Sequence, residues 1–530
     1  MTIRIYTDVS SRLMIAAGIV VVVWILAYII NALLDPLRDI PGPLGARLSR
    51  IWYLRAISKG DFEKTNIDLH RLYGPIVRIA PRQYSLDDPK ALRTIYSHSS
   101  TFIKAAWYDA SGNPNPESHD LFTDRDPRRH SANRRKVASL YSMTSLVQME
   151  SCVVECSTLL IQKLTEFAES GRPLNLQQWM QYYAFDVIGL ITVNKRFGFL
   201  DSGTDQNSLI AALHAYLTYA ANVGVYAEWH PLLAKIVGLL PSQGMGHLQG
   251  FTAHHIAEGQ TNSSAKESNL SSSDSFLEKL LKMHAENPGK ISLADIFTTC
   301  ITNIGAGSDT TSISLTALLY NLFKHQSIHQ TLREEITLAD KQGKLSSPAI
   351  TFQESRDLPY LQACIKEALR LHPATGLPLA RIVPKGGATL SGRFFPEGET
   401  VGVNAWVIHQ NESVFGPDTA SYRPERWLEN PAQSSEMERN FLAVSVLHLP
   451  TPTYILYLEF INHRSCQFGA GARTCIGKNI SLMEIGKLVP ELVRRFDFEL
   501  VDSKASLETQ NVWFVKQTNV ECRVRLRKED

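Results

Sequence analysis

The chain has 530 residues, of which 44% are hydrophobic and 20% are charged, and its formal net charge is +2. These values are ordinary for a globular protein with a large core, and the near-neutral charge excludes nucleic acid or a broadly acidic surface as the main partner. The seven cysteines are scattered and odd in number, which excludes a disulfide framework and a cysteine-rich zinc site and favours a reducing compartment. No break in composition divides the chain, so we expect one large body.

Residues 13–34 form the first predicted element, an uncharged and mostly apolar run of 22 residues. That length spans a bilayer as a helix. Five arginines and lysines follow the run between residues 38 and 59, whereas only Arg4 and Arg12 precede it, so the positive-inside rule places the body in the cytosol. We predict a lumenal N-terminus at 1–12, a transmembrane signal anchor at 13–34, a proline-rich hinge at 35–60 and a body at 61–530.

The pattern of the body predicts a mainly α fold with a small β-sheet region, because short strand-like runs such as Ile76–Ala80 alternate with much longer helical patterns. His130 and Arg134 are four residues apart on a predicted helix and share one face. If the helix is shifted by one residue, Arg135 takes the place of Arg134. Farther on, the serine-rich stretch 261–275 predicts a surface loop.

A helix of about thirty residues is predicted from Ser292 toward Phe323, opened by the capping pair Ser292 and Asp295. Its middle reads Ala-Gly-Ser-Asp-Thr-Thr at 306–311. Glycine and hydroxyl side chains weaken a helix interior. Such a local conflict indicates a functional site, and the alternative is an exposed polar kink.

The next helix carries Glu367 and Arg370, three residues apart, and ends at His372-Pro373. In isolation such a pair is a solvated ion pair of small value. A Pro-Glu-Arg-Trp sequence follows at 424–427.

The most informative stretch is Phe-Gly-Ala-Gly-Ala-Arg-Thr-Cys-Ile-Gly at 468–477. Its glycines let the main chain fold closely around the sulfur of Cys475, and nearby backbone N–H groups can hold a thiolate. This is the chemistry of a haem-thiolate ligand, with Arg473 facing a haem propionate. The alternative is a loop around a structural cysteine.

These motifs resemble those of the cytochrome P450 monooxygenases. The loop at 468–477 fits F-x-x-G-x-R-x-C-x-G at every fixed position, 306–311 fits [AG]-G-x-[DE]-T-[TS], and Glu367 with Arg370 fits E-x-x-R. Pro-Glu-Arg-Trp stands where the family has P-E-R-F, and His130 replaces the tryptophan of W-x-x-x-R. The resemblance implies a cytochrome P450 fold behind an N-terminal transmembrane helix. The stretches 185–189 and 195–199 further resemble the fungal pisatin-demethylase-like branch.

The resemblance also implies roles for individual residues. Cys475 is expected to bind the iron of haem b as an axial thiolate, and Asp309 with Thr310 to supply protons. The remaining expected residues are the haem-propionate contacts Arg473, His130, Arg134 and Arg381, and the structural cluster Glu367, Arg370 and Arg426.

The implied function is a haem-thiolate monooxygenase that inserts one oxygen atom from O2 into an apolar small molecule, by hydroxylation or oxidative demethylation in fungal secondary metabolism. The chain has no nucleotide-binding glycine motif, so NADPH acts through a separate NADPH–cytochrome P450 reductase, with cytochrome b5 as a further partner. The expected location is the endoplasmic reticulum membrane, single-pass, with the catalytic domain in the cytosol. The alternatives are a haem-thiolate isomerase or dehydratase and a non-catalytic haem binder disabled by an insertion at 444–467.

Residues 444–467 depart from the family spacing. Removing these 24 residues joins Phe-Leu-Ala at 441–443 to the cysteine loop and restores an ordinary approach to it. The segment begins Val-Ser and ends in Gln, as the two ends of an in-phase intron would encode. Its apolar run at 454–461 would promote aggregation if exposed. We favour a retained intron over a real insertion loop.

Overall fold

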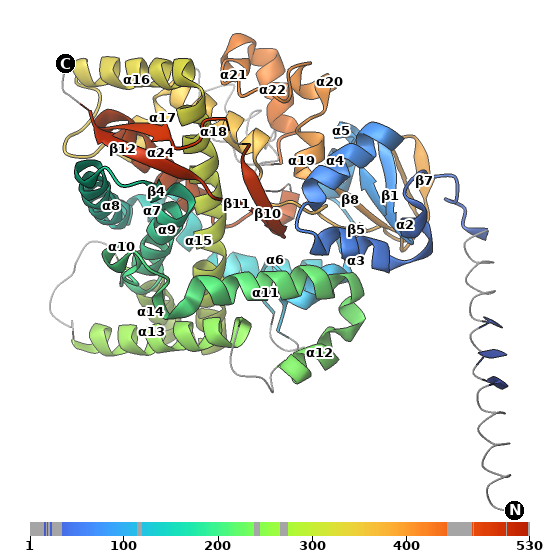
Figure 1. Cartoon of the computed structure of the whole chain (residues 1–530). Helices are drawn as coiled ribbons and strands as arrows, with labels where there is room; N and C mark the ends of the chain where they lie inside the picture. Colours follow the sequence, from blue (N-terminus) through green and yellow to red (C-terminus); the bar gives the residue numbers. More distant parts are fainter. Residues whose placement is uncertain are drawn as a thin grey trace, which may run out of the picture.

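The computed structural model describes residues 34–113, 119–237, 244–265, 274–442, 471–504 and 506–527, together with Gly469 and six residues near the N-terminus (Figure 1). Those six are Ile15, Ala16, Gly18, Ile19, Val22 and Val23, and they are helical and exposed. Most of the expected anchor at 13–34 and the whole segment 444–467 lie outside the described residues.

The helices and strands follow in chain order. The α-helices are α2 (Leu44–Leu48), α3 (Arg50–Ser58), α4 (Phe62–Tyr73), α5 (Pro89–Tyr96), α6 (Pro127–Val137), α7 (Met143–Val147), α8 (Glu150–Ser170), α9 (Leu176–Val193), α10 (Phe199–Ser202), α11 (Leu209–Val223), α12 (His230–Val237), α13 (Met245–Ala265), α14 (Phe276–Glu286), α15 (Leu293–Lys324), α16 (Gln326–Lys341), α17 (Phe352–Arg356), α18 (Pro359–Leu371), α19 (Ala405–Ile408), α20 (Glu412–Phe415), α21 (Arg426–Glu429), α22 (Pro431–Arg439) and α24 (Lys478–Arg495). The 3-10 helices are η1 (Ala106–Ser111), η2 (Ala138–Tyr141), η3 (Gln206–Ser208), η4 (Gly224–Trp229) and η5 (Gly471–Arg473). The strands are β1 (Ile76–Ala80), β2 (Gln83–Leu86), β3 (Ile103–Lys104), β4 (Leu174–Asn175), β5 (Arg381–Ile382), β6 (Ala388–Leu390), β7 (Arg393–Phe395), β8 (Thr400–Val403), β9 (Phe496–Leu500), β10 (Glu508–Val512), β11 (Phe514–Thr518) and β12 (Glu521–Leu526).

A lobe near the N-terminus is built on a sheet with the strand order β1-β2-β8-β5-β3 (Figure 1). β2 and β8 are parallel, with Gln83 opposite Thr400, and the other neighbouring pairs are antiparallel. Tyr84 on β2 and Val401 on β8 are fully buried. The sheet joins segments more than three hundred residues apart, since β2 lies beside β8.

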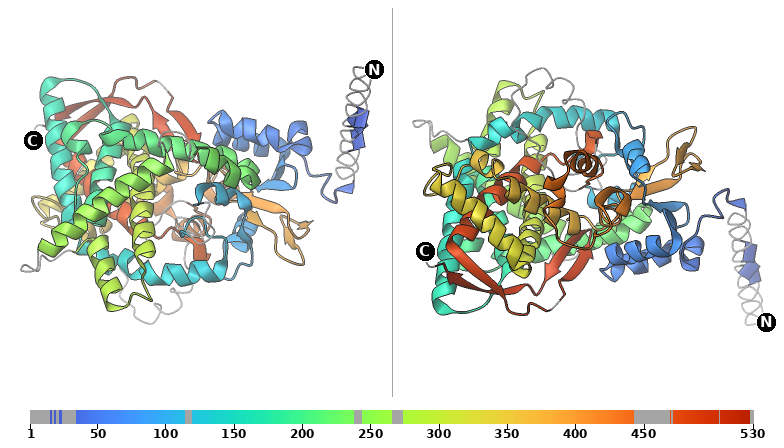
Figure 2. Two further views of the ribbon diagram at one scale, coloured as in Figure 1. Left: turned by 90° about the horizontal axis from the view of Figure 1, so that it is seen from below. Right: turned by 90° about the horizontal axis from the view of Figure 1, so that it is seen from above.

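The rest of the molecule is a helical body, seen from below and above in Figure 2. Its main core lies between α9, α15, α18 and α24, where Phe185, Leu315, Leu361 and Leu488 are fully buried. A sheet of β4, β12 and β9 and the hairpin of β10 and β11 complete this part. The fold is therefore mainly α with small sheets, as predicted.

The long helix α15 runs through the middle of the body (Figure 1) and packs on α9 and α24. It begins as predicted: the Ser292 hydroxyl accepts the Asp295 N–H at 3.1 Å, and the Asp295 carboxylate accepts the Ser292 N–H at 2.9 Å. This reciprocal pair satisfies N–H groups that the first helical turn leaves unpaired.

Two segments differ from expectation. The serine-rich stretch expected as a loop from residue 261 begins as helix, because α13 continues to Ala265. The expected hinge at 35–60 contains α2 and α3 and is packed, since Leu37, Ile40 and Tyr53 are buried. The packed body therefore begins before residue 60.

Among the described residues, one helical run is long and apolar enough to cross a membrane by composition, Gln206–Val237, with a mean hydropathy of 1.2. It includes α11, η4 and α12, and 44% of its most apolar window is buried. α11 packs against η1 and α13.

Candidate active site

The cysteine loop lies between the lobe and the start of α24. Within it, Gly471 has a φ of +64°, and a Cβ at this position would lie 2.3 Å from the carbonyl oxygen of Tyr96. Only glycine permits this approach. The Thr474 hydroxyl closes the turn by donating to the Gly471 carbonyl at 2.7 Å. Phe468 and Ala470 lie outside the described residues.

The side chain of Cys475 is exposed, whereas the other described cysteines are half-buried or buried: Cys152, Cys156, Cys300, Cys364 and Cys522. The protein packed around its sulfur raises the pKa of the thiol, while the backbone N–H groups of Gly477 and Lys478 and the guanidinium of Arg134 lower it. The loop therefore offers an accessible thiol that is surrounded by the groups a thiolate needs.

Helix α6 carries His130 and Arg134 on one face. Its first turn is capped by Asp126, whose carboxylate accepts the N–H groups of Arg128 and Arg129. His130 is buried and Arg134 is half-buried, whereas Arg135 is exposed. Of the two predicted alternatives, the structure therefore places Arg134, and not Arg135, on the inward face of the helix. Burial, followed by the charges of Arg473, Lys104 and Arg134, lowers the pKa of His130 to about 3, so this imidazole is neutral.

Arg381 and Arg473 join the same region. Arg381 is buried and donates from Nη1 to the Ala380 carbonyl at 2.9 Å and to the Tyr108 hydroxyl at 3.2 Å. Arg473 donates to the Asp124 carbonyl at 2.6 Å, and burial together with the charge of Arg381 lowers its pKa to about 10.

A cationic cluster around the cysteine loop consists of Lys104, Arg134, Arg381 and Arg473, and the neutral imidazole of His130 lies beside it. Burial and mutual repulsion lower the pKa values of His130 and Arg473, and Arg381 and Arg473 donate hydrogen bonds to carbonyl and phenol oxygens. Buried cations require an anionic partner. This set of groups fits haem. The thiolate of Cys475 would bind the iron, and the neighbouring cations would bind the two propionate carboxylates.

The hexamer at 306–311 lies in an unbroken part of α15. The alternative of an exposed polar kink is therefore not what the structure shows. The Ser308 and Thr310 hydroxyls donate to the carbonyls of Ile304 and Ala306 at 3.3 and 3.0 Å, so they are satisfied inside the helix. A Cβ on Gly307 would lie 2.9 Å from Ile188 Cγ1 on α9, so close packing accounts for this glycine.

Asp309 is buried and points toward α9 and the C-terminal hairpin. It accepts a short hydrogen bond from the Gln181 side-chain amide, and the Gln181 carbonyl oxygen accepts from Lys516 Nζ at 2.6 Å. Thr310 instead donates to Ala306. Among the described residues, no hydrogen bond joins the Asp309 and Thr310 side chains, so the expected proton-relay pair is adjacent without direct contact.

The acid and arginines of the expected structural cluster meet in the interior. Glu367 accepts from Arg370 at 2.9 and 3.0 Å and from Arg426 Nε at 2.8 Å, and all three side chains are at most 1% exposed. The Trp427 indole N–H donates to Glu367 at 2.9 Å. The cluster ties α18 to α21, and the charges of Glu367, Arg370 and Arg426 are paired and remote from solvent.

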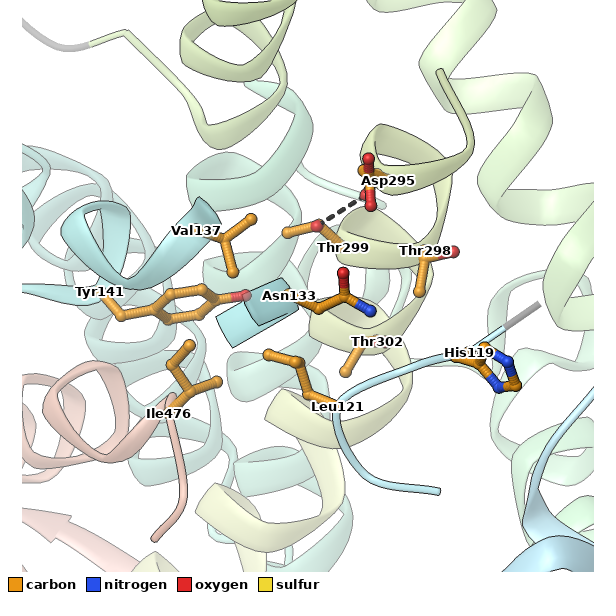
Figure 3. A pocket seen from close by; sticks show the side chains of 10 residues that line it. All are labelled: His119, Leu121, Asn133, Val137, Tyr141, Asp295, Thr298, Thr299, Thr302 and Ile476. Atoms are coloured by element: carbon orange, nitrogen blue, oxygen red, sulfur yellow. Dashed lines mark hydrogen bonds between the residues drawn. The ribbon is translucent and has the colours of Figure 1, made fainter. Parts of the chain in front are cut away.

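A cavity of about 40 Å³ adjoins the cysteine loop (Figure 3). Tyr141 and Ile476 line one side, and residues of the first turns of α15 line the other. The Tyr141 hydroxyl donates to Asn303 at 2.5 Å. This volume is large enough for water and far smaller than the several hundred Å³ of a small-molecule pocket.

Sequence reasoning missed Lys104, Gln181 and Lys516. Lys104 lies in a strand of two residues, which is too short to show periodicity. Gln181 and Lys516 meet across 335 residues. No local pattern predicts either arrangement.

Comparison with known proteins supports the geometric interpretation. The family model described as Cytochrome P450 matches residues 41–521. The chain is 38% identical to a pisatin demethylase of Fusarium vanettenii over 93% of its own length and 89% of that protein. It is 35% identical to the cytochrome P450 monooxygenase gsfF of Penicillium aethiopicum, over 97% and 98% of the two chains, and 34% identical to the monooxygenase cicH of Emericella nidulans, over 93% and 94%. The chain therefore belongs to the cytochrome P450 family and is a monooxygenase of that family.

Proposed function

We propose that this monooxygenase inserts one oxygen atom from O2 into an apolar small molecule of fungal secondary metabolism, by hydroxylation or oxidative demethylation. The observation that carries the proposal is the accessible thiol of Cys475, beside the N–H groups of Gly477 and Lys478 and within reach of the Arg134 charge. Bound at this thiol, haem supplies the oxygen activation that side chains cannot perform.

The chain's own residues divide the remaining work. Cys475 holds the iron, and Arg473, Arg381, Arg134 and His130 hold the propionate edge. The buried carboxylate of Asp309 and the hydroxyl of Thr310 hold and move protons on α15. The scaffold of Glu367, Arg370 and Arg426 keeps α18 and α21 in place behind the loop.

The electrons and the location follow from the same proposal. The chain lacks a nucleotide-binding motif, so NADPH acts through a membrane-bound cytochrome P450 reductase, and cytochrome b5 is a second donor. The apolar run at 13–34 anchors the chain in the endoplasmic reticulum membrane, with the body in the cytosol.

The identity of the ligand is tested by the carbon-monoxide difference spectrum of the reduced protein. We expect a thiolate-type Soret band in the parent, its loss in Cys475→Ser, and its retention in Cys152→Ser, which changes a half-buried cysteine on α8. A thiolate band that persists in Cys475→Ser would overturn the assignment.

The reaction is tested with the reductase, NADPH and a methyl ether. Pisatin is the first compound to try, because a 38% identical relative is named for its demethylation. Oxidative demethylation consumes one O2 and two electrons and releases the free hydroxyl compound, formaldehyde and water. Formaldehyde formation that requires NADPH and Cys475 supports demethylation, whereas a hydroxylated product that keeps its methyl group supports hydroxylation.

A further inference from the structure

The pairing of β3 with β5 creates an unusual contact at the edge of the lobe. Lys104 on β3 lies directly opposite Arg381 on β5, and each residue is only 6% exposed. Directly opposed residues of an antiparallel pair share one face of the sheet, and like charges at such positions are destabilising. Burial removes the water that would screen the repulsion.

Both side chains converge on one aromatic ring. The Lys104 ammonium lies 4.4 Å from the centroid of the Tyr108 ring and 4.6 Å from that of Phe122. It also donates a short hydrogen bond to the Phe122 carbonyl, while Arg381 donates to the Tyr108 hydroxyl. All of these partners are neutral, so they stabilise the positions of the two cations without balancing their charge.

The acids nearest to Lys104 are engaged elsewhere. Asp120 accepts the N–H groups of Phe122 and Thr123 at 2.7 and 2.8 Å. Asp124 accepts from Arg129 at 2.7 and 3.0 Å. Burial, followed by the charges of Arg381 and Arg473, holds the pKa of Lys104 well below its ordinary value. Among the described residues, no ion pair to a carboxylate is formed by this ammonium.

This arrangement indicates an anion that is not part of the polypeptide. The position of the cations next to Cys475 indicates which anion this is. Arg473 precedes Cys475 by two residues, and the charge of Arg134 lowers the pKa of the Cys475 thiol. We propose that Lys104 is a further haem-binding residue, which with Arg381 and Arg473 receives the propionate carboxylates. The inference rests on the proposed function and adds a contact that none of the sequence motifs contains.

The test compares the buried Lys104 with Lys366, a half-buried lysine. Lys104→Met removes an ammonium that forms no ion pair with a carboxylate among the described residues. Lys366→Met removes an ammonium that is paired with Glu438 at 2.6 Å. Two quantities are measured: the rate at which each holoprotein loses haem to excess apomyoglobin, and the unfolding temperature of each haem-free protein.

We expect Lys104→Met to destabilise the haem complex and to stabilise the haem-free protein. Loss of one charge-assisted contact speeds haem release roughly tenfold to a hundredfold, whereas the haem-free protein melts at a higher temperature, because a buried repulsion has gone. Lys104→Arg, which keeps the charge, retains haem within about threefold of the parent. Lys366→Met lowers the melting temperature of the haem-free protein, because it leaves Glu438 buried and unpaired.

Haem dimethyl ester separates a propionate from any other carboxylate, such as that of an acidic substrate. Loaded with the ester, the parent and Lys104→Met should release it at equal rates. If Lys104→Met still loses the ester faster, or retains haem as firmly as the parent, the proposal is overturned. A parent that lacks the thiolate-type Soret band both with and without residues 444–467 would instead refute the proposed function, so the two failures are distinguishable.

Discussion

Asp309 occupies the inner end of a short polar chain that reaches toward the surface. Its carboxylate accepts from Gln181, and Gln181 accepts from Lys516, a half-buried residue of β11. The amide of Gln181 is thereby oriented at both ends, with its N–H on the acid and its oxygen on the ammonium. We infer that Gln181 and Lys516 are positioning residues that hold Asp309 in one orientation.

Substitution of Asp309 by asparagine should lower turnover by roughly a hundredfold or more, because the amide cannot donate and recover a proton as a carboxyl group does. The carbon-monoxide spectrum should not change, since the thiolate lies on another element. Turnover is measured at saturating substrate, so that an effect on kcat is separated from one on KM.

The matched control is Asp295→Asn, which changes an acid in the first turn of the same helix. This variant weakens the helix cap and should lower the melting temperature with little effect on kcat. Equal losses of turnover in the two variants would show that Asp309 has only a structural role.

Glu484 on α24 is fully buried, and neither of its carboxylate oxygens has a hydrogen-bond partner among the described residues. Burial raises its pKa well above the ordinary value of 4.5. Because folding raises the pKa of Glu484, this acid does not lower the free energy of unfolding below pH 4.5. As the pH rises from 4.5 to the folded-state pKa, the acid lowers the free energy of unfolding progressively. The expected slope is about 1.4 kcal/mol per pH unit.

Glu484→Gln should therefore be more stable than the parent at pH 8, and the advantage should shrink toward pH 5. Unfolding temperatures across this range provide the measurement. Glu491→Gln is the control, because this buried acid on the same helix is paired with Arg494 and Arg495 and its loss should destabilise the protein at pH 8. An advantage of Glu484→Gln that does not depend on pH would contradict the interpretation.

At this scale the sequence identifies residues that belong to local motifs and misses those that meet through folding. Cys475, Asp309 and Glu367 stand in recognisable spacings. The importance of Lys104 is seen only in the folded chain, where strand pairing brings Arg381 opposite it. Glu484 likewise becomes a buried acid only through the packing of distant segments. Neither effect leaves a signal in neighbouring residues.

Among the elements, α15 and α9 pack extensively against each other. Gly307→Ala should destabilise the protein by about 1–2 kcal/mol: overpacking against Ile188 costs about 1–3 kcal/mol, and alanine recovers up to about 1 kcal/mol of helix propensity. Denaturant unfolding measures the change.

Two further variants test the cause. Gly250→Ala on α13 has open space around the added methyl group and should stabilise the protein slightly. In an Ile188→Ala background, Gly307→Ala should cost little, because the clash has been removed. An undiminished cost there would mean that the glycine serves the backbone of α15 and not its packing.

The elements that could be predicted are those whose ends carry chemical signals. α15 starts at a reciprocal capping pair, and α18 ends at a histidine before a proline, so the start of α15 and the end of α18 are predicted nearly correctly. The end of α13 has no such signal in its serine-rich sequence. The segment 35–60 looks like a linker by its prolines, and its burial depends on the sheet lobe, which assembles from distant parts of the chain.

For the whole molecule, the decisive question is whether residues 444–467 belong to the protein. The chain just before the segment is held in the core, because Leu442 is buried and donates its N–H to His409 at 2.9 Å. The Gly469 N–H then donates to the Leu442 carbonyl at 3.2 Å, and Gly469 has a φ of +79°. The described residues that flank the segment, Leu442 and Gly469, are therefore in direct contact.

This contact has a specific meaning for the shortened chain. Joining residue 443 to residue 468 makes Leu442 and Gly469 the first and fourth residues of a four-residue turn. The hydrogen bond between them is then the one that closes a β-turn, so the deletion requires no displacement of the core on either side. We propose that the functional protein lacks residues 444–467, as expected for a retained intron.

Deletion of 444–467 should raise the fraction of protein that binds haem with a thiolate-type Soret band, and it should reduce aggregation because the apolar run at 454–461 is removed. Both forms are expressed in parallel, and the carbon-monoxide difference spectrum is normalised to total protein. A control deletion of 266–273, between α13 and α14, should not raise haem content. If the full-length chain carries haem as completely as the shortened one, and spliced transcripts all contain these codons, the segment is a tolerated loop of the native enzyme.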